Sequence, residues 1–273
     1  MYEEPYRWVE AVGNRRTYLD EQFKQGSPVV ALSYERGMLL ATVSKGTPKL
    51  YEIYDRIALG GMGHPADLEK LRFSLLEMAH TEGFNRSPSD VTGARLVKYG
   101  VAPVIKQAFE EVYKAPFILK ILLAELGHKP AKDVLLTINY DGTFEEMTGC
   151  AVLAATPAVQ KDMVSYLSPE LSSTLSLAQA VALALRAWAL GDRAQRQADE
   201  GKDQGDDKET PAEKAATMDA AVLSAHLRES VAEKTIECAV LDRNQPGTSK
   251  YRALTPGELG RLLPSDLNIT LSR

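Results

Sequence analysis

The first stretch of the chain repeats apolar positions at steps of three and four residues. This spacing places them on one face of an α-helix, with charged residues on the opposite face. Over residues 5–25 the positions on the first face are Tyr6, Val9, Val12, Arg16, Leu19 and Phe23. Gly26 follows, and glycine commonly ends a helix. The pattern therefore predicts an amphipathic helix that stops before Gly26.

Beyond Gly26 the pattern changes to short apolar runs separated by turn residues. Runs rich in Val, Leu, Ile and Tyr are typical of β-strands. Four of them cover residues 28–34, 37–43, 49–54 and 56–61. Glu35 and Arg36 join the first two in a hairpin, and Asp55 connects the second pair. We expect the four strands to form one face of an antiparallel sheet.

Helical spacing returns at His64, with Pro65 in the first turn, where its missing N–H is tolerated. A second helix is predicted over residues 87–113. Because Pro103 lies inside this second pattern, we expect a kink near Tyr99 or a broken helix.

The rest of the chain again shows a run of strands followed by a run of helices. Strands are predicted over residues 117–126, 133–140 and 150–156, helices over 157–167, 175–193 and 215–230, a hairpin over 235–242 and 250–254, and a last helix from Thr255 to Leu263. Strands and helices grouped in this way indicate an α+β domain. Two antiparallel sheets between two helical layers, a four-layer αββα sandwich, would satisfy the order, and 273 residues suffice to build it.

The balance of charge excludes one class of partner and marks one segment. Against 32 Lys and Arg stand 37 Asp and Glu, a net charge of −5, whereas nucleic-acid-binding domains are usually basic. We therefore expect no nucleic-acid partner. Eight acids and five bases fall within residues 192–214, which hold no aromatic residue. Such a segment buries too little to offset its ordering entropy, so we expect a mobile surface loop, with an exposed helix as the alternative.

Cysteine usage and the N-terminus bear on the compartment. Cys150 and Cys238 lie far apart and lack C-x-x-C spacing, so we expect two buried thiols in a reducing cytosol and no disulfide. Glu3 and Glu4 stand where an export signal needs basic residues. The apolar stretch 175–190 is shorter than the ~20 residues that cross a bilayer and should form a core helix. A cytoplasmic protein with no membrane partner is predicted.

A metal site and a dinucleotide site would be other classes of function. The histidines are scattered, with none at i, i+4 and none beside a cysteine, so no metal site is expected. Gly61, Gly63 and Ala66 match the G-x-G-x-x-G/A fingerprint of dinucleotide-binding oxidoreductases. That fingerprint needs a parallel strand after the helix, yet a second helix is predicted there. The oxidoreductase is the remote alternative, and no cofactor is expected.

A longer stretch carries the signature of a known family. Residues 27–72 read SPVVALSYERGMLLATVSKGTPKLYEIYDRIALGGMGHPADLEKLR. A valine-rich strand, a glycine-turned hairpin, a K-x-x-E-x-Y-D-R strand and a glycine-led helix in this order resemble the opening of a proteasome subunit. The later segments SDVTGARLVKYGVAPVIKQAFEE, ILLAELG with LTINYDGTF, and IECAVLDRNQPGTSKYRAL resemble the second helix, the next hairpin and the last hairpin of the bacterial type. The resemblance covers residues 29–263, apart from the acidic insert near 194–214, and implies the fold of N-terminal-nucleophile hydrolases.

This family contains catalytic β-type and non-catalytic α-type subunits. A β-type subunit needs a free N-terminal threonine, an acid at the end of the second strand and a lysine on the third, so that its own amine serves as base. In the same register this chain has Ser27, Val43 and Lys49. Pro28 follows Ser27 directly, and a valine cannot hold the charge of the lysine in place. The predicted helix over 5–25 matches the leading helix of α-type subunits, so the α type is expected. A catalytic hydrolase using Ser27 after self-cleavage is the alternative.

What the α type implies is control of access rather than bond cleavage. Such subunits form the outer heptameric ring with other α subunits and stack on β subunits. Residues 1–25 would be the gate segment and leading helix, 26–263 the proteasome-type domain, and 264–273 a C-terminal tail. The gate residues implied are Met1, Tyr2, Glu3, Glu4 and Pro5. Trp8, on the leading helix, is expected at a subunit contact, and Trp188 in the core.

A ring-shaped activator ATPase is the further partner that the resemblance implies. Its C-terminal tails enter pockets between neighbouring α subunits, where a lysine meets the carboxylate of the tail. Lys49 matches this lysine, and Gly63 with His64 matches the loop that lines the pocket. Lysine suits the role as a mobile point charge.

Overall fold

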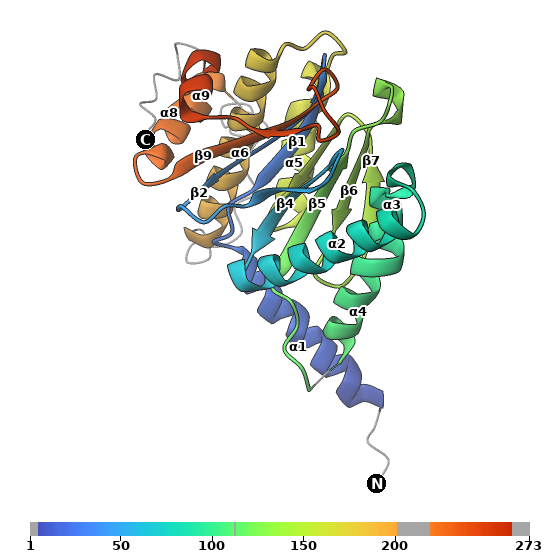
Figure 1. Cartoon of the computed structure of the whole chain (residues 1–273). Helices are drawn as coiled ribbons and strands as arrows, with labels where there is room; N and C mark the ends of the chain where they lie inside the picture. Colours follow the sequence, from blue (N-terminus) through green and yellow to red (C-terminus); the bar gives the residue numbers. More distant parts are fainter. Residues whose placement is uncertain (1–4, 112, 201–218, 264–273) are drawn as a thin grey trace.

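The computed structural model describes residues 5–111, 113–200 and 219–263. Its strands form two antiparallel sheets that lie face to face (Figure 1). One sheet has the order β10-β9-β2-β1-β8 and the other the order β3-β4-β5-β6-β7. The strands are β1 (Val29–Tyr34), β2 (Gly37–Ser44), β3 (Leu50–Tyr54), β4 (Ile57–Gly63), β5 (Leu119–Glu125), β6 (Val134–Ile138), β7 (Phe144–Met147), β8 (Cys150–Leu153), β9 (Thr235–Asp242) and β10 (Tyr251–Ala253).

Helices cover the outer face of each sheet. The α-helices are α1 (Pro5–Phe23), α2 (Pro65–Asn85), α3 (Gly93–Leu96), α4 (Ala102–Glu110), α5 (Pro157–Leu167), α6 (Leu177–Glu200), α8 (Ala220–Val231) and α9 (Pro256–Leu262). Helices α5, α6, α8 and α9 pack on the β1-containing sheet, and α2, α3 and α4 on the β4-containing sheet (Figure 1). The predicted four-layer αββα sandwich is therefore confirmed.

Three apolar clusters hold these layers together. The first lies between the β1-containing sheet and its helices and includes Trp188, which is fully buried as predicted. The second lies between the two sheets and takes in Leu40, Leu122 and the end of α1 at Phe23. The third joins the β4-containing sheet to its helices around Leu71. Each fully buried side chain of this size contributes roughly 1.5–3 kcal/mol, so the sandwich is a rigid support for the residues at its ends.

The prediction that the first four strands share one sheet is wrong. Strands β1 and β2 pair in one sheet, with Val29 opposite Thr42, whereas β3 and β4 pair in the other, with Leu50 opposite Gly60. The exposed residues 45–48 carry the chain between the sheets. Periodicity defines which face of a strand is buried, but the pairing partner is set by non-local packing.

The predicted break near Tyr99 is confirmed. A π-helical segment, Val97–Val101, separates α3 from α4, and Pro103 lies in the first turn of α4. The widened turn accommodates the proline, which has no N–H to donate. The predicted helix start at residue 87 is wrong, because Pro88–Asp90 is a separate 3₁₀ turn and α3 begins after its N-cap Thr92.

The acidic segment begins as a continuation of a helix. Helix α6 extends to Glu200, so residues 192–200 are helical rather than looped, and Asp192 is buried. Residues 201–214 of the segment lie outside the described residues, as does the predicted tail 264–273.

The remaining predictions about the chain as a whole concern its thiols and its relation to membranes and metals. Cys150 and Cys238 are free and buried, as expected. None of the helices described combines the length and the apolar character that a membrane span requires. Within the same described ranges, no group of three or more His, Cys, Asp and Glu side chains is arranged to hold a metal ion.

Candidate functional site

Ser27 lies at the junction between α1 and β1, where an N-terminal nucleophile would stand. Its hydroxyl donates a hydrogen bond to the carbonyl oxygen of Val43 and accepts one of 2.9 Å from the indole Nε1 of Trp188. A serine hydroxyl can donate one hydrogen bond. Here the acceptor of that bond is a backbone carbonyl and not a general base. The structure brings Ser27 and Val43 together, but through the backbone of Val43.

The peptide bond before Ser27 is also held in place. The carbonyl oxygen of Gly26 accepts a 2.7 Å hydrogen bond from Nε2 of Gln195, and the Gly26 N–H donates to the carbonyl of Phe23 at 2.9 Å. Oε1 of Gln195 accepts in turn from the N–H of Ala155 at 2.8 Å. The amine that would act as base in an N-terminal-nucleophile enzyme is here a peptide nitrogen, which cannot accept a proton at neutral pH.

The position expected for the catalytic acid contains only an apolar side chain. Val43 is fully buried in the cluster between the sheet and α6. Strand β2 pairs with β9, so that Val43 is opposite Ile236 and Thr42 is opposite Glu237. Glu237 is therefore the carboxylate of β9 that lies nearest in register to the position of Val43.

Glu237 holds the backbone of Lys49. Its carboxylate accepts hydrogen bonds from the N–H groups of Lys49 and Leu50, at distances from 2.8 to 3.1 Å. Burial raises the pKa of this carboxyl group, although the two N–H donors and the charge of Lys49 oppose the rise. The structure thus fixes the start of β3 through a half-buried acid rather than through a turn.

The Lys49 side chain is half-buried. Burial, with a smaller contribution from the positive charge of Lys234, lowers the pKa of its ammonium to about 8, against the opposing effect of Glu237. None of the salt bridges among the described residues includes Lys49. Its charge is therefore available to pair with a carboxylate that approaches from outside the chain.

A second charged cluster lies behind Ser27. Asp192 of α6 is buried and accepts from His226 at 2.9 Å and from Lys234 at 3.2 Å, and it pairs with Arg196 at 2.8 Å. Burial alone would raise the pKa of Asp192, but these three partners outweigh it and lower the pKa. The Lys234 ammonium also lies 5.3 Å from the ring centre of Trp188, the indole that holds Ser27.

Gly63 and His64 form the turn between β4 and α2. Gly63 has φ +134°, and a Cβ there would lie 2.1 Å from the carbonyl oxygen of Ile118, so the turn requires glycine. His64 caps α2, with its Nδ1 accepting from the N–H of Ala66 at 3.3 Å. The backbone of Lys49 lies beside this turn, since its carbonyl accepts from the N–H of Gly61 at 3.0 Å.

Of the three residues predicted for the docking pocket, His64 alone lines the cavity beside the turn between β4 and α2. His64 lines a cavity of about 530 Å³ together with Lys70 and Phe117. Lys49 is not part of that lining.

The dinucleotide fingerprint is explained by packing. Strand β5 follows α2 but pairs antiparallel with β4, so the required βαβ unit does not form. A Cβ at Gly61 would meet Leu68 at 2.2 Å, which is why α2 can pack so closely on the sheet. The remote alternative, a dinucleotide-binding oxidoreductase, therefore lacks the unit that it requires.

Helix α1 extends beyond the sandwich beside α4 (Figure 1). Arg15 attaches it to the C-terminal end of α4, donating to the carbonyl oxygens of Ala108, Phe109 and Glu111 at 2.9, 3.0 and 2.8 Å. These carbonyls include groups that a helix end leaves without partners. Asp20 adds a hydrogen bond of 2.9 Å from the hydroxyl of Tyr140.

The first half of α1 is less covered than the second. Trp8 is 50% exposed and Val9 64%, whereas Leu19 is fully buried. Of the predicted gate residues, Pro5 begins α1, and Met1, Tyr2, Glu3 and Glu4 lie outside the described residues.

Several residues of this region were missed by reasoning from sequence. Gln195 and Asp192 fall at the end of an apolar helix, where the charged composition suggested a loop. The available signal was that both polar residues interrupt the apolar face of α6 at a spacing of three, so that they point to the same side. Glu237 gave a similar signal, as a single acid within the apolar run of β9.

The fold and this region together define a class of protein. Two antiparallel sheets between helical layers, with a serine leading into the first strand and a lysine leading into the third, form the sandwich of the N-terminal-nucleophile hydrolases. A family model described as proteasome subunit matches residues 23–202. The chain belongs to the proteasome subunit family.

Named relatives identify the type of subunit. The proteasome subunit alpha of Streptomyces scabiei is 26% identical, over 94% of this chain and 90% of the relative. That of Saccharopolyspora erythraea is 29% identical, over 88% and 80%. That of Actinosynnema mirum is 30% identical, over 65% and 66%. The resemblance to bacterial α-type proteasome subunits is thereby confirmed.

Proposed function

We propose that this chain is a non-catalytic α-type subunit, which forms an outer heptameric ring, controls substrate access and docks an activator ATPase while partner β subunits cleave the substrate. The observation that carries the non-catalytic role is the state of Ser27. Its hydroxyl donates a hydrogen bond to a backbone carbonyl, and a valine, Val43, stands at the position of the catalytic acid. Gln195 holds the carbonyl of Gly26, the residue before Ser27. A nucleophile without a base is inert.

The gating role is supported by the way α1 is attached. Hydrogen bonds from Arg15 and to Asp20 fix its second half, so the direction in which its first residues leave the body is set by the fold. In a ring of such subunits, seven copies of residues 1–5 would meet near the axis. The exposed Trp8 would then lie against a neighbouring α subunit, consistent with the enrichment of tryptophan at interfaces.

The docking role is supported by Lys49, Gly63 and His64. The lysine is held by its backbone and has no salt-bridge partner among the described residues, so its charge is poised for an acidic tail. The turn at Gly63 lies beside Lys49, because Gly61, two residues earlier, donates its N–H to the Lys49 carbonyl at the same end of the sheet. The missing wall would come from the neighbouring α subunit, as expected for a pocket between subunits.

The intact mass of the purified protein tests the non-catalytic role. We expect a chain that keeps its residues before Ser27, because self-cleavage needs a serine activated by a base. We also expect the isolated protein to hydrolyse no fluorogenic peptide, and Ser27→Ala to leave the activity of the assembled particle unchanged. A chain that begins at Ser27 would contradict the proposal, and so would peptide hydrolysis that is lost in Ser27→Ala.

A second experiment tests the gate through the attachment of α1. Arg15→Gln removes charge-assisted hydrogen bonds to four backbone carbonyls, those of Ala108, Phe109, Glu111 and Lys114, each contributing about 1.5–3 kcal/mol at most. We expect the assembled particle to hydrolyse a short peptide roughly tenfold faster without activator, because a loosened α1 no longer directs residues 1–5 to the axis. Arg7→Gln, an exposed change on the same helix, is the matched control. Equal rates for Arg15→Gln and the unaltered particle, at equal assembly, would refute this role of α1.

A further inference from the structure

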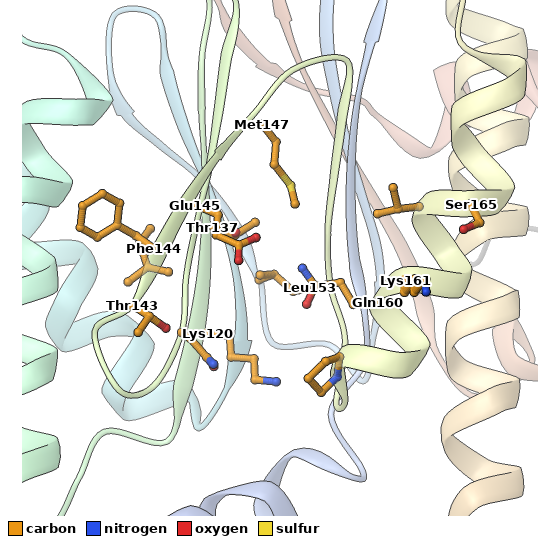
Figure 2. A pocket seen from close by; sticks show the side chains of 14 residues that line it. Lys120, Thr137, Thr143, Phe144, Glu145, Met147, Leu153, Gln160, Lys161 and Ser165 are labelled. Carbon is orange, nitrogen blue, oxygen red and sulfur yellow. The ribbon is translucent and has the colours of Figure 1, made fainter.

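A cavity of about 420 Å³ opens between the edges of the two sheets (Figure 2). Strand β7 borders it on one side, and β8 with helix α5 on the other. Met147, Leu153 and Val164 supply apolar walls. Its volume lies in the range of small-molecule sites, and neither Ser27 nor Lys49 lines it.

Lys120 of β5 brings a buried positive charge to this cavity. The side chain is 8% exposed, and its Nζ donates to the carbonyl oxygens of Ala154 and Ala155 at 2.8 and 2.9 Å. The ring of Phe23 lies beneath it, with its centre 4.9 Å from Nζ. An ammonium has three N–H donors, and no salt bridge within the described ranges includes Lys120. A buried cation without a carboxylate is unfavourable, so the third donor suits the carboxylate of a ligand.

Glu145 of β7 brings a negative charge to the same cavity. Leu122 of β5 and Glu145 both lie opposite Thr137 of β6, and Lys120 is two residues from Leu122. Lys120 and Glu145 are therefore on the same face of the sheet. Two strand spacings and two residue steps separate their Cα atoms by about 12 Å. The two charges face one cavity without neutralising each other.

Figure 2 shows Lys120, Glu145 and Gln160 directed toward the same space from β5, β7 and α5, while the ring of Phe144 points away from it. The cavity thus has a buried cation at Lys120, an anion at Glu145, apolar walls and an amide, and Lys161 of α5 adds a second lysine to its lining. A ligand that satisfies all four features carries a carboxylate, an ammonium group, apolar side chains and an internal amide.

We propose that this cavity binds a short free peptide of two or three residues, with its C-terminal carboxylate at Lys120 and its N-terminal ammonium at Glu145. A tripeptide in extended conformation spans about 10 Å, so it fits between two side chains whose Cα atoms lie about 12 Å apart. The Gln160 amide can bond a peptide group, and the apolar side chains pack on Met147 and Leu153. The site is separate from gating and docking and does not depend on the proposed function.

Calorimetric titration of the full chain tests the site, with the free-ended tripeptide alanyl-leucyl-alanine as probe. We expect saturable one-to-one binding that weakens at least about tenfold when the peptide is N-acetylated or C-amidated, because each change removes one charge-assisted contact. Lys120→Met and Glu145→Gln should each weaken binding to a similar degree. Glu146→Gln is the matched control, since Glu146 lies on the opposite face of β7 and its loss should leave binding unchanged.

The pH dependence gives an independent signature. Burial lowers the pKa of Lys120 to about 8, although Asp20 and Asp141 oppose the shift. Only the protonated ammonium pairs with a carboxylate, so binding should weaken as the pH rises through about 8. Absence of tripeptide binding would overturn the proposal, as would equal affinity for the free and the end-blocked peptides, a comparison that needs no variant to fold. Binding that is unchanged in correctly folded Lys120→Met would also overturn it.

Discussion

Replacing Lys49 by alanine is expected to abolish activator-stimulated degradation while the particle still assembles. The backbone of Lys49 is held by Glu237 through its N–H group, which alanine retains, so β3 should keep its place. What disappears is the ammonium, whose charge is left without a salt-bridge partner among the described residues. Removing one member of a desolvated charge pair typically costs 2–5 kcal/mol or more, which corresponds to a loss of stimulation of roughly thirtyfold or greater.

The pH dependence of stimulation shows whether Lys49 acts through the charge of its ammonium or only through the size of its side chain. Burial lowers the pKa of Lys49 to about 8, with Lys234 adding to the effect and Glu237 opposing it. The protonated form is the one that pairs with a carboxylate, so stimulation should be full below pH 8 and should fall as the pH rises through this value. Lys49→Arg keeps its charge at every pH used and should give a flat profile.

Degradation of an unfolded protein substrate, with and without activator, measures this effect, and peptide hydrolysis by the same particle corrects for changes in the β subunits. Lys45→Ala is the matched control, because Lys45 is exposed in the loop just before Lys49. Stimulation that is unchanged in Lys49→Ala would remove Lys49 from the docking site. Since the proposed non-catalytic role is tested by intact mass, it would survive that outcome.

The secondary structure of this chain could largely be predicted because each segment spaces its apolar residues in the manner of either a strand or a helix. The short apolar runs of β1, β2 and β9 and the helical spacing in α1 and α6 arise from residues close in sequence. The assignment of strands to sheets failed at residues 45–48, where nothing local records that the chain crosses from one sheet to the other. Pairing of β2 with β9 joins residues nearly 200 positions apart, and no periodicity reports such a contact.

The candidate site divides in the same way. Ser27, Val43 and Lys49 could be selected because they stand at fixed distances along one continuous stretch. Gln195 could not, since its partner Gly26 lies 169 residues away. The local indication was a polar residue within an apolar pattern. Such a pattern predicts that the residue is buried, but it does not predict which residue it bonds to.

These long-range contacts support the proposal that Ser27 is not catalytic. Trp188, from the middle of α6, occupies the acceptor side of the Ser27 hydroxyl, and Lys234 stacks on that indole. Asp192 holds Lys234 in turn. The charges of Asp192 and Lys234 thus neutralise each other instead of acting on the Ser27 hydroxyl. We expect this charged cluster to contribute to stability and not to catalysis.

Asp192→Asn is expected to destabilise the protein strongly. The amide keeps the size of the side chain but leaves Lys234, His226 and Arg196 without their shared negative charge. Removing one partner from a buried charge network costs about 3–5 kcal/mol, and the lower figure applies because Arg196 is half-exposed. For a chain of this size a loss of about 3 kcal/mol lowers the melting temperature by roughly 6–12 °C. Asp199→Asn changes an exposed residue about two turns further along α6 and should have no measurable effect.

Acid should reveal the same cluster in the unaltered protein. His226, Lys234 and Arg196 lower the pKa of Asp192 below its usual range even though burial acts in the opposite direction. The folded state therefore binds this proton more weakly than the unfolded state, whose aspartate has a pKa of about 3.9. The stabilisation is complete above that value and is lost as the pH falls through the lower pKa of the folded state. Melting curves between pH 7 and pH 3 should consequently converge for the unaltered protein and Asp192→Asn as the pH decreases. A constant difference between the two curves over this range would show that the carboxylate charge is not what Asp192 contributes.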